Sequence, residues 1–184
     1  MKHLIVLIMI AMFVPHKAAA QFNTDRLMVS GRSALYYEDY VLSIQYFNQV
    51  LTPKPYLYEP WFFRGLAKYY LDDYSGAESD LSHAISLNPY IANMYELRGL
   101  CRIRQNSYAD AICDYDHSLR LNPQNQAAWY NRALCRVEQK DYAQAQLDLD
   151  TIVVKWKQFA SAYSLKAQIY LAEKDTTSAD KWLD

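Results

Sequence analysis

Residues 62–74, FFRGLAKYYLDDY, place an arginine and a glycine inside a pattern that otherwise resembles an apolar helix. Glycine costs about 1 kcal/mol in a helix interior, and Arg64 and Lys68, one turn apart, repel each other slightly. The same arrangement returns 34 residues later as ELRGLC (96–101) and again as YNRALC (130–135). A feature that returns at a fixed interval indicates a repeat.

The 34-residue period runs through the chain without an insertion. It divides the sequence into unit one (24–57), unit two (58–91), unit three (92–125), unit four (126–159) and a partial unit five (160–184). One position shared by the five units, called the large position, carries a large apolar side chain: Leu27, Trp61, Tyr95, Trp129 and Tyr163. Two are small: Gly31, Gly65, Gly99, Ala133 and Ala167, then Ser43, Ala77, Ala111, Ala145 and Ala179.

Each unit is predicted to form two helices. In unit two the first helix is expected from about residue 60 to 71, the turn at 72–74 and the second helix from about 75 to 87. Asn88-Pro89 ends the second helix, because proline lacks the N–H and clashes with the preceding turn. The small positions are expected where the two helices cross closely, so Gly65 is interpreted as a contact residue.

These recurring positions resemble the pattern of the tetratricopeptide repeat family, whose 34-residue unit opens with W-x2-L-G-x2-Y and closes with proline. The matching residues are Trp61, Gly65, Tyr74, Ala77, Leu81, Ala84 and Pro89 in unit two, and Tyr95, Gly99, Tyr108, Ala111, Tyr115 and Pro123 in unit three. The resemblance covers residues 24–184. It implies an all-α fold, a right-handed α-solenoid of about five stacked helix-turn-helix units.

The chain departs from the family pattern by carrying charges. Basic residues occupy two positions of the first helices, and an aspartate occupies one position of the second helices. These residues are Arg64, Lys68 and Asp80; Arg98, Arg102 and Asp114; and Arg132, Arg136 and Asp148. Unit one has Ser30 and Tyr46 instead of the arginine and the aspartate, so both charges vanish together. We therefore expect an acid–base ladder, with pairing either within a unit or between neighbours.

The sequence offers no sign of catalysis, a cofactor or a metal site. Outside the first twenty residues the only histidines are His83 and His117, which lack the close spacing of a zinc site. The three cysteines, Cys101, Cys113 and Cys135, are interpreted as small packing residues. No phosphate-binding glycine loop or nucleophile motif is present.

The start of the chain is typical of a secretory signal peptide. Lys2 precedes an uninterrupted apolar run, LIVLIMIAMFV (4–14), and an Ala-x-Ala pattern occupies 18–20. A run of this length is too short for a bilayer core, which needs about 20 residues, but it suits a signal peptide. We expect residues 1–20 to be removed before Gln21. An uncleaved membrane anchor is the alternative.

Removal of residues 1–20 would leave 17 basic and 20 acidic side chains, a net charge of −3. Such a weakly acidic surface disfavours nucleic acid, whose binders carry clustered basic patches. We expect no membrane contact after cleavage, and a location in a periplasm or outside the cell.

The resemblance implies a concave face, lined by the first helices, that binds protein or peptide segments. The expected lining residues are Met28, Arg32, Tyr36, Phe62, Leu66, Tyr69, Tyr70, Asn93, Glu96, Leu100, Arg104 and Tyr130. Tyrosine, phenylalanine and arginine suit an interface. The Lys/Asn clamp by which chaperone-binding members hold a C-terminal carboxylate has no counterpart at Met28, Arg32, Phe63, Asn93 and Leu97.

The sequence therefore predicts a non-enzymatic, exported scaffold that binds a protein or peptide. The alternative is the targeting or assembly module of a larger enzyme or envelope machine. Unit five lacks the tyrosine turn and ends at Asp184 within its expected second helix. Solenoids usually end in a polar capping helix, so self-association through this end is a further expectation.

Overall fold

The computed structural model describes residues 23–182, and within this range it contains helices and no strand. Residues 23–36 are helical and pair with α2 (Tyr40–Leu51). The remaining helices are α3 (Tyr58–Tyr70), α4 (Tyr74–Leu87), α5 (Ala92–Arg104), α6 (Tyr108–Leu121), α7 (Gln126–Glu138), α8 (Tyr142–Lys155), α9 (Ala160–Ala172) and the short α10 (Thr176–Asp180). The predicted all-α stack of helix pairs is confirmed.

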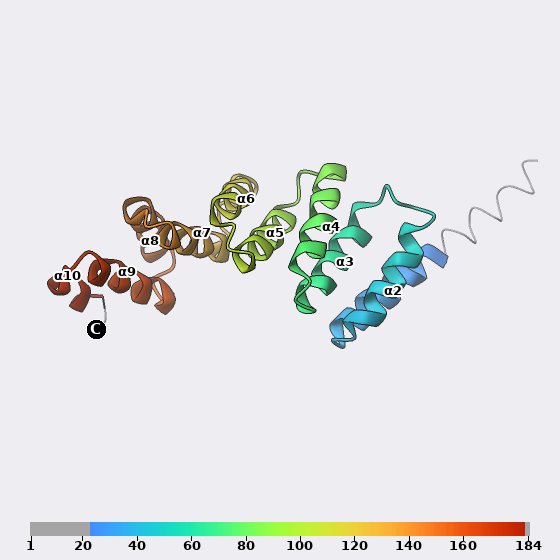
Figure 1. The fold of residues 1–184 in the computed structure, drawn as a ribbon, viewed down its shortest axis with the longest axis horizontal. Coiled ribbons are helices and arrows are strands. Elements are labelled where there is room, and N and C mark those ends of the chain that lie inside the picture. Colours follow the sequence, from blue (N-terminus) through green and yellow to red (C-terminus); the bar gives the residue numbers. More distant parts are fainter. Residues whose placement is uncertain (1–22, 183–184) are drawn as a thin grey trace, which may run out of the picture.

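The helix pairs follow one another along an elongated molecule (Figure 1). Each helix packs mainly against its neighbours in sequence, and first helices of successive units also touch, α3 against α5 and α7 against α9. The helices α3, α5, α7 and α9 begin 34 residues apart, so their outward side chains recur along one face. The structure thus presents the first helices as the repeated element on which a site can be built.

The turn inside each unit has one conformation throughout. Its central residue has a positive φ of 60° to 65° in each unit: Glu38, Asp72, Asn106, Lys140 and Lys174. The next residue is the N-cap of the second helix, and the side chain of Asp39, Asp73, Asp141 or Asp175 accepts a hydrogen bond from a backbone N–H of the first turn. Ser107 stands at this place in unit three without such a bond.

The small positions are close helix contacts, as expected. A Cβ on Gly65 would lie 3.1 Å from Leu81 Cγ and 3.3 Å from the carbonyl oxygen of Ala77. A Cβ on Gly99 would lie 2.9 Å from Tyr115 Cζ. Glycine therefore stands at position 99 because the facing ring leaves no room for a methyl group.

The aromatic residues at the large position also bind the loops that precede their helices. Trp61 Nε1 donates to the carbonyl of Pro55 at 2.8 Å, and Trp129 Nε1 donates to the carbonyl of Pro123 at 3.0 Å. Tyr95 donates to the carbonyl of Pro89 at 3.2 Å. The sequence pattern treated these residues as packing groups only, but each also fastens the loop that joins it to the preceding unit.

The expected signal peptide, residues 1–20, lies outside the described residues. Between residues 23 and 182 no helix combines the length and the apolar character that crossing a membrane requires.

Candidate functional site

The expected ion ladder is present in units two, three and four, and its pairs form within each unit. Arg64 reaches Asp80 at 2.6 Å, Arg98 reaches Asp114 at 2.7 Å and Arg132 reaches Asp148 at 2.6 Å. The second base contacts the same carboxylate: Lys68 at 2.8 Å, Arg102 at 2.9 Å and Arg136 at 2.6 Å. Each aspartate thus holds two bases of the first helix.

The three aspartates are almost fully buried, with side chains 2% to 4% exposed. A buried carboxylate loses hydration, and the attraction of the two bases offsets that loss. Such an arrangement is weak evidence of added stability. It is better interpreted as a device that fixes how the two helices of a unit are aligned.

The same arginines also bond backward to the preceding unit, which the sequence pattern did not predict. Arg64 Nη1 donates to Asn48 at 2.6 Å, Arg98 Nη1 to Ser82 at 3.0 Å and Arg132 Nη1 to Asp116 at 2.5 Å. Each acceptor lies 16 residues before its arginine, as each aspartate lies 16 after it. One guanidinium therefore joins two units.

Aromatic rings complete the surroundings of these arginines. The guanidinium carbon of Arg64 lies 4.5 Å from the ring centroid of Trp61, and that of Arg132 lies 4.7 Å from Trp129. Arginine favours such positions because its planar cation stacks on aromatic faces while its N–H groups bind carboxylates. The ladder thus connects each of these first helices to the second helix of its own unit and to that of the preceding unit.

The predicted groove residues divide by exposure. Arg32, Tyr36, Tyr70, Asn93 and Arg104 are exposed, while Phe62, Leu66, Tyr69, Glu96, Leu100 and Tyr130 are half-buried. Phe62, Leu66, Tyr69 and Leu100 pack against one core cluster, and Tyr130 packs against Phe159. The exposed members are therefore the ones whose surface is free in this structure.

One groove prediction needs correction, and a second groove residue has a partner within the chain. Met28 is 8% exposed and packs with Phe47 and Val50, so it belongs to the core of unit one and offers no contact surface. Glu96 is engaged within the chain, because its Oε2 accepts a hydrogen bond from Asn125 Nδ2 at 2.6 Å. Asn125 also caps α7, so Glu96 supports the start of that helix.

Tyrosines gather at the turn ends of units one and two. Tyr36 and Tyr37 are 82% and 76% exposed, with ring centroids 5.2 Å apart. Tyr40 stacks on Tyr70 of the next unit at 5.0 Å, with ring planes inclined by 16°. Tyr70 itself is 53% exposed. The result is an aromatic surface that extends from one unit to the next.

The cysteines and histidines differ in their surroundings. Burial raises the pKa of the Cys101 and Cys135 thiols to about 12, as suits packing residues, whereas Cys113 is exposed and the packing interpretation does not hold for it. All three thiols are free. His83 and His117 are exposed and lie on the rings of Trp61 and Tyr95. Among residues 23–182 no group of three His, Cys, Asp or Glu side chains could hold a metal ion.

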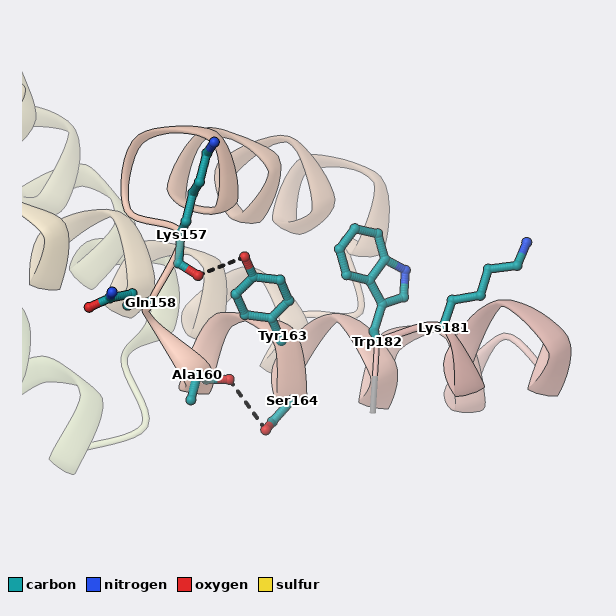
Figure 2. Close-up of a pocket in the computed structure, with 7 residues that line it drawn as sticks. All are labelled: Lys157, Gln158, Ala160, Tyr163, Ser164, Lys181 and Trp182. Carbon is teal, nitrogen blue, oxygen red and sulfur yellow. Dashed lines mark hydrogen bonds between the residues drawn. The ribbon is translucent and has the colours of Figure 1, made fainter. Parts of the chain in front are cut away.

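A pocket of about 460 Å³ opens beside α9, and no motif in the sequence pointed to it. Figure 2 shows Tyr163 at its centre, donating to the carbonyl of Lys157 at 2.9 Å, with Trp182 and Lys181 beyond it. Trp182 stands where the inner units have the ladder aspartate. The ammonium of Lys166, at the ladder arginine position, lies 4.0 Å from the Trp182 ring centroid and pairs with Asp150.

The comparisons with known proteins agree with this architecture. Models of the tetratricopeptide repeat family match residues 64–117 and 114–147. Residues 64–147 are thus similar to tetratricopeptide repeats. Stacked helix pairs continue on both sides of this segment in the part of the chain that the structure describes. No curated protein matches the sequence.

Solved structures show the same fold at low sequence identity. A MamA structure from Desulfovibrio magneticus RS-1 is 14% identical with a TM-score of 0.83, covering 88% of this chain and 91% of that one. YrrB, described as a TPR protein with an unusual peptide-binding site, is 12% identical with a TM-score of 0.81, covering 92% and 88%. The first TPR of Spaghetti (RPAP3), bound to an HSP90 peptide, is 23% identical with a TM-score of 0.57, covering 70% and 94%. Identities this low establish the fold alone.

Proposed function

We propose that the chain is a non-enzymatic scaffold that binds a protein or peptide segment on the face built by its first helices. The observation that carries this proposal is the aromatic surface of Tyr36, Tyr37, Tyr40 and Tyr70, which spans two units and is largely exposed. Exposed apolar side chains that gather on a soluble protein often mark an interaction site. Tyrosine gives a large contact area, and its short side chain loses little entropy on binding.

The ladder supports the proposal. Arg64 bonds to its own unit through Asp80 and to unit one through Asn48, so α2, α3 and α4 are held together by one side chain. A surface fixed before binding loses less entropy when a partner arrives. The peptide-binding site described for YrrB and the HSP90 peptide bound to the RPAP3 repeat support such a role for this fold.

The proposal includes export. Its support is the apolar run 4–14 followed by the Ala-x-Ala pattern at 18–20. Mass spectrometry of the protein recovered from a Gram-negative host tests it, because cleavage predicts an N-terminus at Gln21. A chain that keeps residue 1 and stays in the membrane fraction would favour the anchored alternative, and one that keeps it in the cytosol would contradict export.

Partner capture tests the binding role. Wild-type protein and a Tyr36→Ser/Tyr70→Ser variant are used as baits after chemical cross-linking, with Tyr56→Ser/Tyr90→Ser as the matched control. Tyr56 and Tyr90 are 64% and 78% exposed and lie in the loops between units. We expect the first variant to lose its partners and the control to keep them. Equal recovery by all three baits would show that the aromatic surface is not the binding surface.

A further inference from the structure

The acidic residues of the turns are concentrated in units one and two. The five turn residues with positive φ are Glu38, Asp72, Asn106, Lys140 and Lys174, in chain order. Their backbone geometry is similar, so the units differ here in the side chain. In units one and two this acidic residue is followed by a second one, Asp39 or Asp73, whereas in units four and five a lysine is followed by Asp141 or Asp175.

Negative charge borders the aromatic surface directly. Glu38 follows Tyr37 in the chain and is exposed, and no described side chain pairs with it. Burial and, second, the charge of Glu38 raise the pKa of the Tyr40 hydroxyl. Asp39 is also exposed, and one of its oxygens accepts from the backbone N–H of Leu42. Two carboxylates, Glu38 and Asp39, therefore lie between Tyr37 and Tyr40 in the chain.

The nearby cations are committed elsewhere. Arg104 lies beside the hydroxyl of Tyr69, and this hydrogen bond is the main reason that the pKa of Arg104 is raised. The guanidinium carbon of Arg32 lies 5.8 Å from the ring centroid of Phe63. Neither contact reaches Tyr36, Tyr37 or Glu38. The end of the surface formed by unit one therefore combines exposed ring faces with two carboxylates, and Arg32, one helical turn before Tyr36, is its nearest basic residue in the sequence.

We propose that this end of the surface, made by Tyr36, Tyr37, Glu38, Asp39, Tyr40 and Tyr70, binds an arginine- or lysine-bearing segment of the partner. This rests on the proposed scaffold function and names the chemistry of its ligand. The π-face of an aromatic ring attracts a cation, and a carboxylate pairs with it. Arginine fits best, because its guanidinium stacks on a ring and still donates to a carboxylate. An acidic segment would meet repulsion here.

The binding test uses hexa-arginine amide carrying a rhodamine label, with labelled hexa-glutamate as the opposite-charge probe. Fluorescence anisotropy gives the dissociation constants for the mature chain. We expect hexa-arginine to bind and hexa-glutamate not to bind, and we expect the affinity to fall as salt is raised from about 0.02 to 0.5 M. Tyr36→Ser/Tyr70→Ser and Glu38→Gln should each weaken hexa-arginine binding by roughly tenfold or more.

Two controls separate a local site from net charge. Glu138→Gln removes the same charge from an exposed residue at the end of α7, and Tyr90→Ser removes an exposed ring far from the surface. Both should bind hexa-arginine as the wild-type chain does. Equal weakening by Glu138→Gln and Glu38→Gln, or absence of hexa-arginine binding, would overturn the inference.

These experiments can reject the cationic ligand without rejecting the scaffold function. If cross-linked partners require Tyr36 and Tyr70 but are indifferent to Glu38→Gln and to competing hexa-arginine, the scaffold function holds and the cationic ligand is excluded. If the mass measured by sedimentation equilibrium rises with concentration and Glu38→Gln or Lys140→Gln abolishes this rise, a second copy occupies the surface and the inference fails. A mass equal to one chain, together with hexa-arginine binding at Glu38, supports it.

Discussion

Replacement of Gly99 by alanine tests the packing rule on which the stack depends. The added Cβ would lie 2.9 Å from Cζ, 3.1 Å from Cε2 and 3.3 Å from Cε1 of Tyr115. The Tyr115 side chain is 0% exposed, so the ring has no free space to move into. Overpacking of a core costs about 1–3 kcal/mol, whereas alanine gains about 1 kcal/mol over glycine in a helix. We expect a net loss of about 1 kcal/mol in the free energy of unfolding.

A second substitution should reverse that loss. Unit four already pairs Ala133 with Leu149, both fully buried, at the positions where unit three pairs Gly99 with Tyr115. In the Gly99→Ala/Tyr115→Leu double variant the methyl group should fit as it does in unit four. We therefore expect a favourable coupling of about 1 kcal/mol or more between the two substitutions, a size typical of residues in contact.

Urea unfolding followed by circular dichroism and by tryptophan fluorescence measures the four members of this cycle. Coincident transitions with equal m-values are needed, because repeat arrays can lose cooperativity. If Gly99→Ala stabilises the chain by its helix propensity and the two substitutions are additive, the close helix crossing does not select glycine, and the reasoning is refuted. The expected loss corresponds to about 2–4 °C in Tm.

Three further outcomes follow from the ladder, the turns and the thiols. Asp148→Asn should lower the free energy of unfolding by about 3 kcal/mol, because two bases lose a buried anion. Asp116→Asn, at a side chain 37% exposed, should lower it by less than about 1 kcal/mol. Equal losses would refute the distinction between the buried and the exposed carboxylate. Lys140→Gly should raise the free energy of unfolding by roughly 0.5–1 kcal/mol, because glycine adopts the φ of 62° at this position without strain. Lys140→Ala should not raise it. One thiol, Cys113, should react with Ellman's reagent in the folded chain, and the other two only in urea. Because those two thiols have pKa values raised from 9.0 to about 12, their contribution to stability should fall as pH rises from 9 towards 12.

The sequence predicted the fold and the pairing of ladder arginines with aspartates because both depend on a strict period, but it left open whether the pairs form within a unit or between units. An arginine and an aspartate 16 residues apart can meet only if the helices of a unit fold back on each other, and the structure places Arg64 and Asp80 in contact. The between-unit half was not predicted, because its acceptors, Asn48, Ser82 and Asp116, share a position but not a side chain. Their common role is visible only once neighbouring units are placed together.

Exposure was harder to predict than position. The period assigns a residue to a helix face, but the size of its neighbours decides whether it reaches solvent. Met28 occupies a groove position, yet it lies against Phe47 and is buried. Tyr36 is the last residue of the same helix and is exposed. The acidic and aromatic character of the first turns was present in the sequence, but without ring contacts such as Tyr40 on Tyr70 the residues could not be assigned to one surface.

The five units also act as comparisons for one another within a single chain. In unit one the ladder arginine and aspartate are both absent. In unit five the aspartate position holds Trp182, yet a base, Lys166, remains, with its side chain 4% exposed. That lysine keeps the backward contact, to Asp150 of unit four, and the aromatic face of Trp182 takes the place of the forward carboxylate. Unit five therefore retains a basic residue although it has lost the ladder aspartate, and the acceptor in the preceding unit is still present. The contact between units, together with the Trp182 ring, therefore holds a cation at this position, and the ladder serves the stacking of units as well as the pairing of helices within them.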